Sequence, residues 1–287
     1  MGVYKIKDLE NLSGIKAHTI RIWEKRYNIL KPNRSDTQIR EYSDSELTTL
    51  LNISLLNKHG IKISRIAEMS PNEMCSLLKK KENENFEDCF HENLLLALLN
   101  LDENLFKETL NHLIEEIGLE HCYSDHLIPF LERIGIMWQV GTINPAQEHF
   151  ISNLIRQKLI TEIDKINLSD ETTKCLILFL PEHETHELSL LFYDYLLKKE
   201  GYKTYYLGQM LPYDSLIQSV SKIKPDAIVS SWISAVDEEY CISYFNRIAK
   251  EINIPIYVGG NLIKTHFSKL NTVVHLIDSL NDLKKIF

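Results

Sequence analysis

The sequence predicts a multidomain protein in which α-helical domains precede an α/β domain. Between residues 86 and 166, apolar side chains recur at three- and four-residue spacing, which is typical of amphipathic helices. From residue 175 onward, short apolar runs alternate with helical patterns, which is typical of a parallel sheet covered by helices on both faces. A chain of 287 residues has room for two or three separate cores.

Charge is distributed unevenly along the chain. Residues 1–80 hold 14 Lys and Arg against 9 Asp and Glu, a net charge of +5, and the remainder holds 18 against 31, a net charge of −13. A basic head on an acidic body favours a polyanionic partner for the head alone. A chance fluctuation in composition is the alternative interpretation.

The sequence also excludes several protein classes. No apolar run approaches the roughly 20 residues that a membrane span needs, and the N-terminus lacks the apolar core of a signal peptide. The five cysteines lie far apart without C-x-x-C spacing, so neither a zinc site nor a disulfide framework is indicated. We therefore expect a cytoplasmic protein with no membrane partner.

Residues 4–27 predict a helix, a tight turn at Gly14 and a second helix, and residues 30–42 predict a two-stranded wing that Tyr42 anchors to the core. A helix-turn-helix places its second helix in the major groove of DNA. Long cations and a hydroxyl suit contacts with phosphates and base edges there. The predicted DNA-binding residues are Lys16, His18, Thr19, Arg21, Lys25 and Arg26 on the second helix and its start, with Arg34 and Arg40 on the wing.

This head resembles a known family over about residues 2–72. Thr19-Ile-Arg-Ile-Trp-Glu24, then Arg34, then Ile39-Arg-Glu-Tyr-Ser-Asp44 before a helix, is similar to the pattern of the MerR family of winged-helix regulators. The resemblance implies dimers that bind near-palindromic operators in double-stranded DNA. The alternative is a helical scaffold with solvated cations.

The next part of the chain predicts a four-helix antiparallel bundle. We expect a head at residues 1–75, a linker at 76–85, the bundle at 86–166, a second linker at 167–174 and the α/β domain at 175–287. Breaks are expected near residues 100–102, at Gly118 and at 141–145, with a third helix over about 119–139 and a fourth over about 145–165.

The loop between the third and fourth helices places three side chains close together. Trp138 ends one helix, Pro145 starts the next in a position that proline favours, and Glu148 and His149 fall in the first turns after it. Periodicity alone favours Trp138 as a core aromatic, Glu148 as a charge at a helix N-terminus and His149 as a solvated or hydrogen-bonded side chain.

Five strand and helix pairs predict a flavodoxin-like (Rossmann-type) parallel α/β domain. The expected strands are residues 175–180, 203–207, 227–233, 256–258 and 273–276, with helices near 186–199, 212–223, 237–252, 260–269 and 279–286. Two histidines and three acids in the stretch from Pro181 to Ser189 follow the first strand. Open α/β sheets bind ligands at this end of their strands.

Pieces of this domain resemble domains that bind adenosylcobalamin or methylcobalamin. The matching pieces are Glu184-x-His186, Tyr206-Leu-Gly208, Ser231-Trp-Ile233 and Gly259-Gly260, each at the end of a strand. The resemblance implies that His186 ligates cobalt from below, that Glu184 orients its imidazole, and that small residues let the nucleotide tail thread into the sheet. The chain departs from the motif at Ser189, which replaces a glycine and adds a hydroxymethyl group where the tail passes, at Ile233, which replaces a leucine, and at the bulky Trp232.

Nearly the whole chain is similar to the light-responsive cobalamin-binding repressors of the MerR superfamily. In that family a Trp followed ten residues later by Glu-His shields the adenosyl group, and Trp138 with Glu148 and His149 matches this spacing. The resemblance implies that Trp138 packs over the upper axial group and that Glu148 contacts the adenosyl moiety. It also implies that His149 approaches cobalt once light breaks the cobalt–carbon bond.

We therefore expect a transcriptional repressor, not an enzyme, that forms a dimer or tetramer under the control of adenosylcobalamin and light. Two alternatives stay open. In one, the protein is a MerR-type regulator whose cobalamin-like domain has lost the cofactor because of Ser189, and senses another ligand or only oligomerises. In the other, it is a corrinoid carrier of a methyltransferase system.

Overall fold

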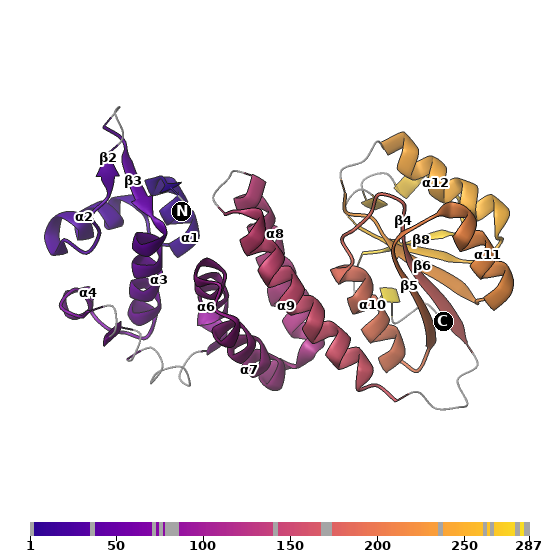
Figure 1. Ribbon diagram of the computed structural model, residues 1–287, viewed down its shortest axis with the longest axis horizontal. Coiled ribbons are helices and arrows are strands. Elements are labelled where there is room, and N and C mark those ends of the chain that lie inside the picture. The colour runs from indigo at the N-terminus through magenta and orange to yellow at the C-terminus, as the bar shows by residue number, and fades with distance from the viewer. Residues whose placement is uncertain are drawn as a thin grey trace. The chain divides into compact units, whose positions relative to one another are not determined.

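A computed structural model (Figure 1) shows a helical N-terminal half followed by an α/β half. It describes residues 3–34, 38–70, 73–74, 77, 86–139, 143–167, 174–234, 238–260, 263–264, 267–278 and 282–283. The chain divides into two compact units, Met1–Leu154 and Ile155–Phe287. The predicted linkers at 76–85 and 167–174 fall almost wholly outside the described residues, so the predicted domain boundaries stay a prediction.

The head contains the predicted helix-turn-helix. Helix α1 spans Ile6–Ser13 and helix α2 spans Ala17–Tyr27. Gly14 ends α1 in the left-handed conformation with a φ of 71°, which glycine adopts without strain. Leu9, Leu12 and Ile20 are buried on the shared face. Helices α3 (Asp44–Lys58) and α4 (Ile63–Ile66) complete the head.

The predicted wing is also present, as strands β2 (Asn33–Arg34) and β3 (Arg40–Ser43). A short strand that the sequence pattern did not indicate, β1 (Val3–Tyr4), pairs with the other edge of β3. The Tyr42 side chain is buried and its hydroxyl donates to Glu24 at 3.3 Å, which confirms its predicted anchoring role.

The helical region that follows has four helices, α6 (Phe86–Asn100), α7 (Glu103–His121), α8 (Ile128–Gln139) and α9 (Pro145–Asp164). Gly118 has non-helical dihedrals (φ 81°, ψ 158°) and breaks α7 at the predicted point. The predicted third helix, about 119–139, is helical throughout, but residues Cys122–Leu127 form a π-helical segment that the prediction did not include. Such widened turns leave no mark in the three- and four-residue apolar spacing.

Two polar contacts join the head to this helical region within the first unit. Arg133 of α8 donates through one Nη2 to the carbonyl oxygens of Leu12 at 2.6 Å and Asn11 at 3.1 Å. These carbonyls belong to the last turn of α1, where a positive charge is favoured. Lys58 of α3 forms an ion pair with Glu92 of α6 at 2.6 Å.

The α/β part is a five-stranded parallel sheet, as predicted. Its strands are β4 (Cys175–Pro181), β5 (Lys203–Leu211), β6 (Ala227–Ser231), β7 (Ile256–Gly259) and β8 (Val274–Ile277), in the order β5-β4-β6-β7-β8. Helix α10 (Leu188–Lys199) contacts β4, β5 and β6. Helices α11 (Tyr213–Ile223) and α12 (Glu238–Glu251) share one apolar core with alternate residues of β4, β6 and β7. This strand order and crossover pattern is flavodoxin-like.

Three predicted elements of this part differ from the structure. The third strand ends at Ser231 rather than at 233, because the amides of Ile233 and Ser234 donate to the Glu184 carboxylate and not to a neighbouring strand. The second strand continues to Leu211 rather than ending at 207. Within the helix predicted for 260–269, the described residues 263–264 are helical, and Phe267–Lys269 form a 3-10 turn. The helix predicted for 279–286 lies largely outside the described residues. Among the described helices, none combines the length and apolarity that crossing a membrane requires.

Candidate functional site

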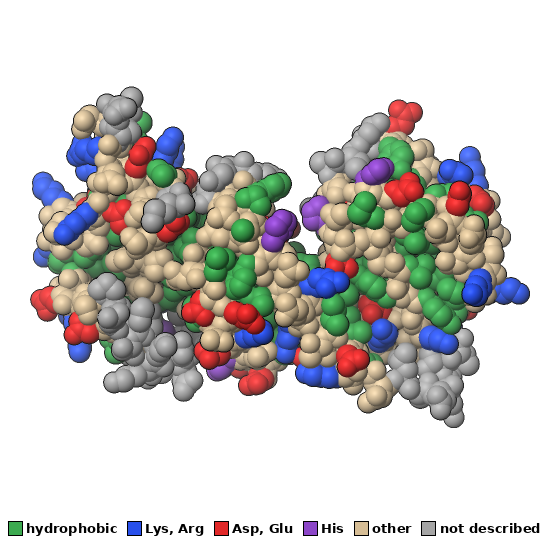
Figure 2. All heavy atoms as spheres, viewed as in Figure 1, with side chains coloured by type: hydrophobic (Ala, Val, Ile, Leu, Met, Phe, Trp, Pro, Cys, Tyr) green, Lys and Arg blue, Asp and Glu red, His purple; other side chains and the backbone are tan. Residues whose placement is uncertain are grey.

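The exposed side of α2 carries the predicted DNA-binding residues. Arg21, Lys25 and Arg26 are exposed to solvent, and the Thr19 hydroxyl lies 3.3 Å from Nε2 of His18. Figure 2 shows Lys and Arg side chains projecting around the N-terminal head. This face of the helix therefore presents cations and a hydroxyl at its surface, as groove binding requires.

Three of the predicted DNA contacts already have polar partners within the head. Lys16 pairs with Glu10 at 3.1 Å, Arg40 with Glu24 at 3.4 Å, and Arg34 donates to Gln38 at 3.4 Å. The hydrogen bond from Lys16 holds the pKa of Glu10 below its usual value. Exposed pairs of this kind are weak, so phosphates can compete for these cations.

One residue of α2 was missed by the sequence reasoning. Ile22 is 54% exposed, whereas the other apolar side chains of α2 are buried or partly buried. It follows Arg21 directly and lies one turn after His18. An exposed apolar side chain on a groove-reading helix suits the methyl group of thymine. The signal available in the sequence was that Ile22 falls off the stripe of Ile20 and Trp23.

The loop between α8 and α9 holds the second group of predicted residues. The Trp138 side chain is 51% exposed, so it is not the core aromatic that periodicity alone favours. The Ile143 amide donates to the Met137 carbonyl at 3.4 Å, which draws the start of α9 toward the end of α8. Nδ1 of His149 lies 2.9 Å from the Glu148 carboxylate, which also accepts from Ser152. A large exposed aromatic and an acid–histidine pair therefore belong to neighbouring helix ends.

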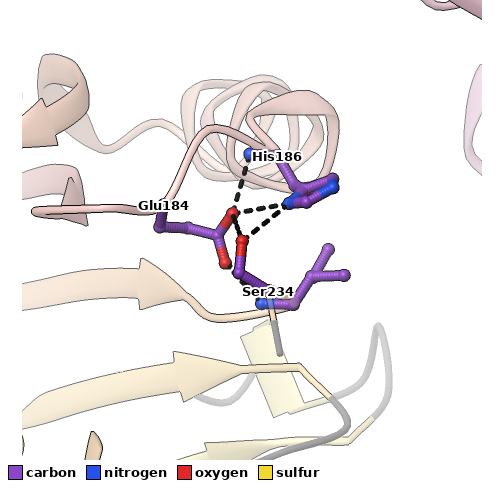
Figure 3. A network of polar contacts seen from close by, with 4 residues as sticks. Glu184, His186 and Ser234 are labelled. Carbon is purple, nitrogen blue, oxygen red and sulfur yellow. Dashed lines mark hydrogen bonds and ion pairs between the residues drawn. The ribbon is translucent and has the colours of Figure 1, made fainter. Parts of the chain in front are cut away.

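The most organised polar network is in the loop between β4 and α10. The Glu184 side chain is fully buried, and its Oε1 accepts from the His186 amide at 2.8 Å, from the His186 ring Nδ1 at 2.7 Å and from the Ser234 hydroxyl at 3.0 Å. Its Oε2 accepts from the amides of Ile233 at 2.7 Å and Ser234 at 2.8 Å. Figure 3 shows these side chains converging from two loops.

These hydrogen bonds fix the protonation of the pair. Burial alone would raise the pKa of Glu184, but the bonds from His186, Ser234 and Ile233 lower it to about 2. The carboxylate is therefore ionised near neutral pH and can only accept, so Nδ1 of His186 carries the ring proton. When the ring carries only this proton, its lone pair lies on Nε2, and the side chain is 56% exposed. A histidine oriented by a carboxylate in this way is a good metal ligand.

Apolar side chains surround this loop at the surface. Met210, Ile233 and Tyr240 are all counted among the exposed large hydrophobic residues. The Met210 amide donates to the Glu184 carbonyl at 3.3 Å, and the Tyr240 ring centroid lies 6.5 Å from that of His183. Exposed apolar residues grouped around a histidine suit a flat, largely apolar ligand.

The predicted small residues lie within β5 and at the ends of β6 and β7. Gly208 and Gly260 have φ angles of 79° and 113°. A Cβ on Gly260 would stand 2.0 Å from the Trp232 carbonyl oxygen, so this position has no room for a side chain. The Ser231 hydroxyl is buried and has no hydrogen-bond partner among the described residues. A buried hydroxyl without a partner is a group that a ligand can satisfy.

Two side chains of α10, Ser189 and Tyr193, bear on the room beside these small residues. Ser189, the residue that departs from the motif, is half-buried in the first turn of α10. Tyr193, one turn further, places its hydroxyl 2.1 Å from the position that a Cβ on Gly259 would take. The Tyr193 hydroxyl therefore lies directly against the Gly259 backbone.

Two further observations concern metal binding and a groove away from the Glu184–His186–Ser234 network. Among the described residues, no group of three or more His, Cys, Asp and Glu side chains could hold a metal ion. A protein site with one histidine ligand is consistent with that finding. An open groove of about 1010 Å³ on α12, lined by residues such as Arg247 and Lys250, shares no residue with the His186 network.

Two family models match the helical N-terminal half of the chain, and two curated relatives match nearly its whole length. Residues 4–73 match the MerR HTH family of regulatory proteins, and residues 91–161 match a B12 binding domain. The HTH-type transcriptional repressor CarH of Myxococcus xanthus is 26% identical over 272 residues, which cover 92% of this chain and 90% of that protein. The repressor CarA of the same organism is 25% identical over 269 residues, covering 93% and 89%.

A solved structure supports the fold of the region behind the head. The monomethylamine corrinoid protein of Methanosarcina barkeri superposes with a TM-score of 0.57 at 14% identity, covering 70% of this chain and 97% of that protein. Members of the helix-turn-helix family matched by the head bind DNA and are regulators rather than enzymes. The chain therefore carries a MerR-type helix-turn-helix domain at residues 4–73 and a B12 binding domain at residues 91–161, and over about nine tenths of its length it is similar to the CarH and CarA repressors.

Proposed function

We propose that this protein is a repressor that binds operator DNA as a homo-oligomer under the control of adenosylcobalamin and light. The observation that carries the proposal is the Glu184–His186–Ser234 network, in which a buried, ionised carboxylate holds one partly exposed imidazole. No catalytic role explains that arrangement as well as ligation of a single metal centre.

The residues present fit the cofactor. Adenosylcobalamin supplies a cobalt that one histidine can ligate and a cobalt–carbon bond that visible light breaks. His186 is the lower ligand, and Glu184 holds its Nδ1 proton. In this proposal Ser231, with its buried hydroxyl, and the backbones of Gly208, Gly259 and Gly260 line the path of the nucleotide tail. The Tyr193 hydroxyl, which lies against Gly259, has to move for the tail to enter. Ile233 presents an apolar side chain beside the dyad.

The helical region supplies the residues of the upper side in this proposal. Trp138 covers the upper axial group with an aromatic face that is exposed in the structure. Glu148 would contact the adenosyl moiety, and His149, whose Nδ1 lies 2.9 Å from the Glu148 carboxylate, would be the candidate cobalt ligand after illumination.

Control of DNA binding follows from linkage. A cofactor that binds one assembly state better shifts the population toward that state. Assembly raises operator affinity because several heads engage the DNA together. The DNA contacts are those of the head, from Lys16, His18, Thr19, Arg21, Lys25 and Arg26 on α2 and its start and from Arg34 and Arg40 on the wing.

A second candidate function is favoured by one observation. The Tyr193 hydroxyl fills the space beside Gly259, and Ser189 adds a hydroxymethyl group on the same helix. If these side chains keep the tail out, the protein is a MerR-type regulator that senses another ligand or only oligomerises. A corrinoid carrier function is disfavoured by the DNA-binding head.

The first test is the visible spectrum of the protein mixed with adenosylcobalamin in darkness and then passed through gel filtration. We expect coloured protein, and His186→Ala should remove the spectral change that marks histidine ligation. His183→Ala is the matched control. His183 is exposed in the same loop, and its side chain is not among the described donors to the Glu184 carboxylate. Colourless wild-type protein would favour the second candidate.

The second test concerns the switch itself. Dark and illuminated samples are compared by light scattering and by binding to an operator duplex. We expect the dark, loaded protein to be larger and to bind more tightly. Equal mass and equal affinity in both samples would remove light from the proposal while leaving cofactor binding to be judged by the spectrum.

A further inference from the structure

A second buried carboxylate stands directly beside His186. Glu187 is the residue before α10, and its side chain is only 8% exposed. One of its oxygens accepts from Nε of Arg156 on α9, and the other accepts from the hydroxyl of Tyr206 on β5 at 3.0 Å. Both carboxylate oxygens are therefore hydrogen-bonded, each to a different element.

This network is costly to break, because a buried carboxylate that loses its cation remains as an uncompensated charge. Burial and the nearby Glu187 charge raise the pKa of Tyr206, so its phenol keeps the proton that it donates. Arg156 supplies a planar donor with a fixed charge. The three side chains thus form one unit that holds Glu187 in place.

Glu187 directly follows the candidate metal ligand His186 in the sequence. His186 and Glu187 are consecutive, so the imidazole side chain is fixed by Glu184 while the next backbone unit is fixed by Arg156 and Tyr206. The network is absent from the acid-x-His pattern, because Glu187 is the residue after the histidine and its partners lie 31 and 19 residues away.

Arg156 also belongs to a helix with a second candidate ligand. His149 precedes Arg156 by seven residues on α9, which is close to two helical turns, so both lie on the same side of that helix. Arg156 itself belongs to the second compact unit, as do Glu187 and Tyr206, so the network is complete within that unit.

We propose that Arg156, Glu187 and Tyr206 are positioning residues that fasten the His186 loop to α9 and set the placement of the cobalt ligand. The ligand role of His186 rests on the proposed function. The fastening itself is a property of this chain with or without the cofactor.

The experiment compares Arg156→Gln with Arg156→Lys, using Lys158→Gln as the matched control. Lys158 lies on the same helix and pairs with Glu162 at 2.7 Å, so its loss removes an α9 ion pair without touching the loop. Tyr206→Phe is a milder variant that removes only one hydrogen bond. All variants are full-length and are first compared by thermal unfolding.

The first readout needs no cofactor. In protein labelled with ¹⁵N-histidine, the imidazole resonances of His186, assigned with His186→Ala, should shift and broaden in Arg156→Gln, less so in Tyr206→Phe, and stay at their wild-type positions in Lys158→Gln. Arg156→Lys should restore them in part. Wild-type resonances in Arg156→Gln would overturn the inference.

The second readout is titration with hydroxocobalamin in the dark. Loss of a residue that orients a metal ligand typically lowers affinity roughly 10- to 100-fold, and we expect a loss of that size with a weaker histidine-ligation spectrum in Arg156→Gln alone. Unchanged affinity and spectrum would contradict a positioning role. If wild-type protein binds no corrinoid, the proposed function fails, and the imidazole resonances still decide whether the fastening exists.

Discussion

Glu184 shows what one buried carboxylate does when every lone pair has a donor. The sequence predicted Glu184 beside His186, because two residues of spacing are visible in the pattern. It did not predict the Ile233 amide or Ser234, which lie 49 and 50 residues further along and come together with Glu184 only when β4 and β6 pair. The acid–histidine pair could be predicted from the sequence, whereas the other donors to the Glu184 carboxylate depend on how the strands pair.

The acid stability of the protein should report this network. The pKa of Glu184 is lowered from 4.5 to about 2, so the stabilisation is fully present above pH 4.5 and is lost as pH falls toward 2. The effect is at most about 3 kcal/mol. We expect the gap in unfolding free energy between wild type and Glu184→Gln to shrink over that pH window, measured by urea unfolding. A gap that stays constant with pH would show that the carboxylate titrates normally.

Two glycines should respond to alanine in opposite ways. Gly260→Ala places a Cβ 2.0 Å from the Trp232 carbonyl at a φ of 113°, so we expect destabilisation of more than roughly 2 kcal/mol. Gly135→Ala is the control, because this α8 position has nothing within 4 Å and alanine should stabilise the helix by about 0.5–1 kcal/mol. Thermal unfolding compares them, and equal melting temperatures would contradict the crowding at Gly260.

At the scale of elements, the long periodic segments were the predictable ones. Runs such as Leu176–Leu180 are fully buried strands, and their apolar character is visible without a structure. Strand β1 has two residues and forms by pairing Val3 with Ser43, so no local pattern marks it. The apolar residues of the π-helical segment at Cys122–Leu127 keep nearly the spacing of an α-helix, so the sequence pattern does not reveal this segment either.

The contact of Arg133 on α8 with the end of α1 should stabilise α1. Arg133→Gln removes charged hydrogen bonds to the carbonyls of Asn11 and Leu12, at a cost of about 1–3 kcal/mol. We expect faster amide hydrogen exchange in α1 specifically. Lys107→Gln, which removes an exposed pair with Glu103, should change stability by less than about 0.5 kcal/mol and leave α1 unaffected. Identical α1 exchange in the two variants would count against the contact.

At the scale of the whole molecule, the charge separation of the sequence should appear in DNA binding. Each phosphate contact contributes roughly 0.9 to the slope of log affinity against log salt concentration. Arg21→Gln should lower that slope, and Lys222→Gln, an equal change of charge in the α/β unit, should not. Fluorescence anisotropy with a labelled duplex at several salt concentrations measures both. Equal slopes for the two variants would place the polyanion contact elsewhere.

Helix α9 crosses the boundary between the two compact units, and Arg156 lies just beyond it. A fragment of the α/β domain that starts within residues 167–174 therefore lacks Arg156, the cation that pairs with Glu187. In such a fragment, the Glu187 carboxylate next to His186 has no positively charged partner from α9. A cut at residue 143, before α9, keeps the pair together and is the sounder starting point for recombinant fragments.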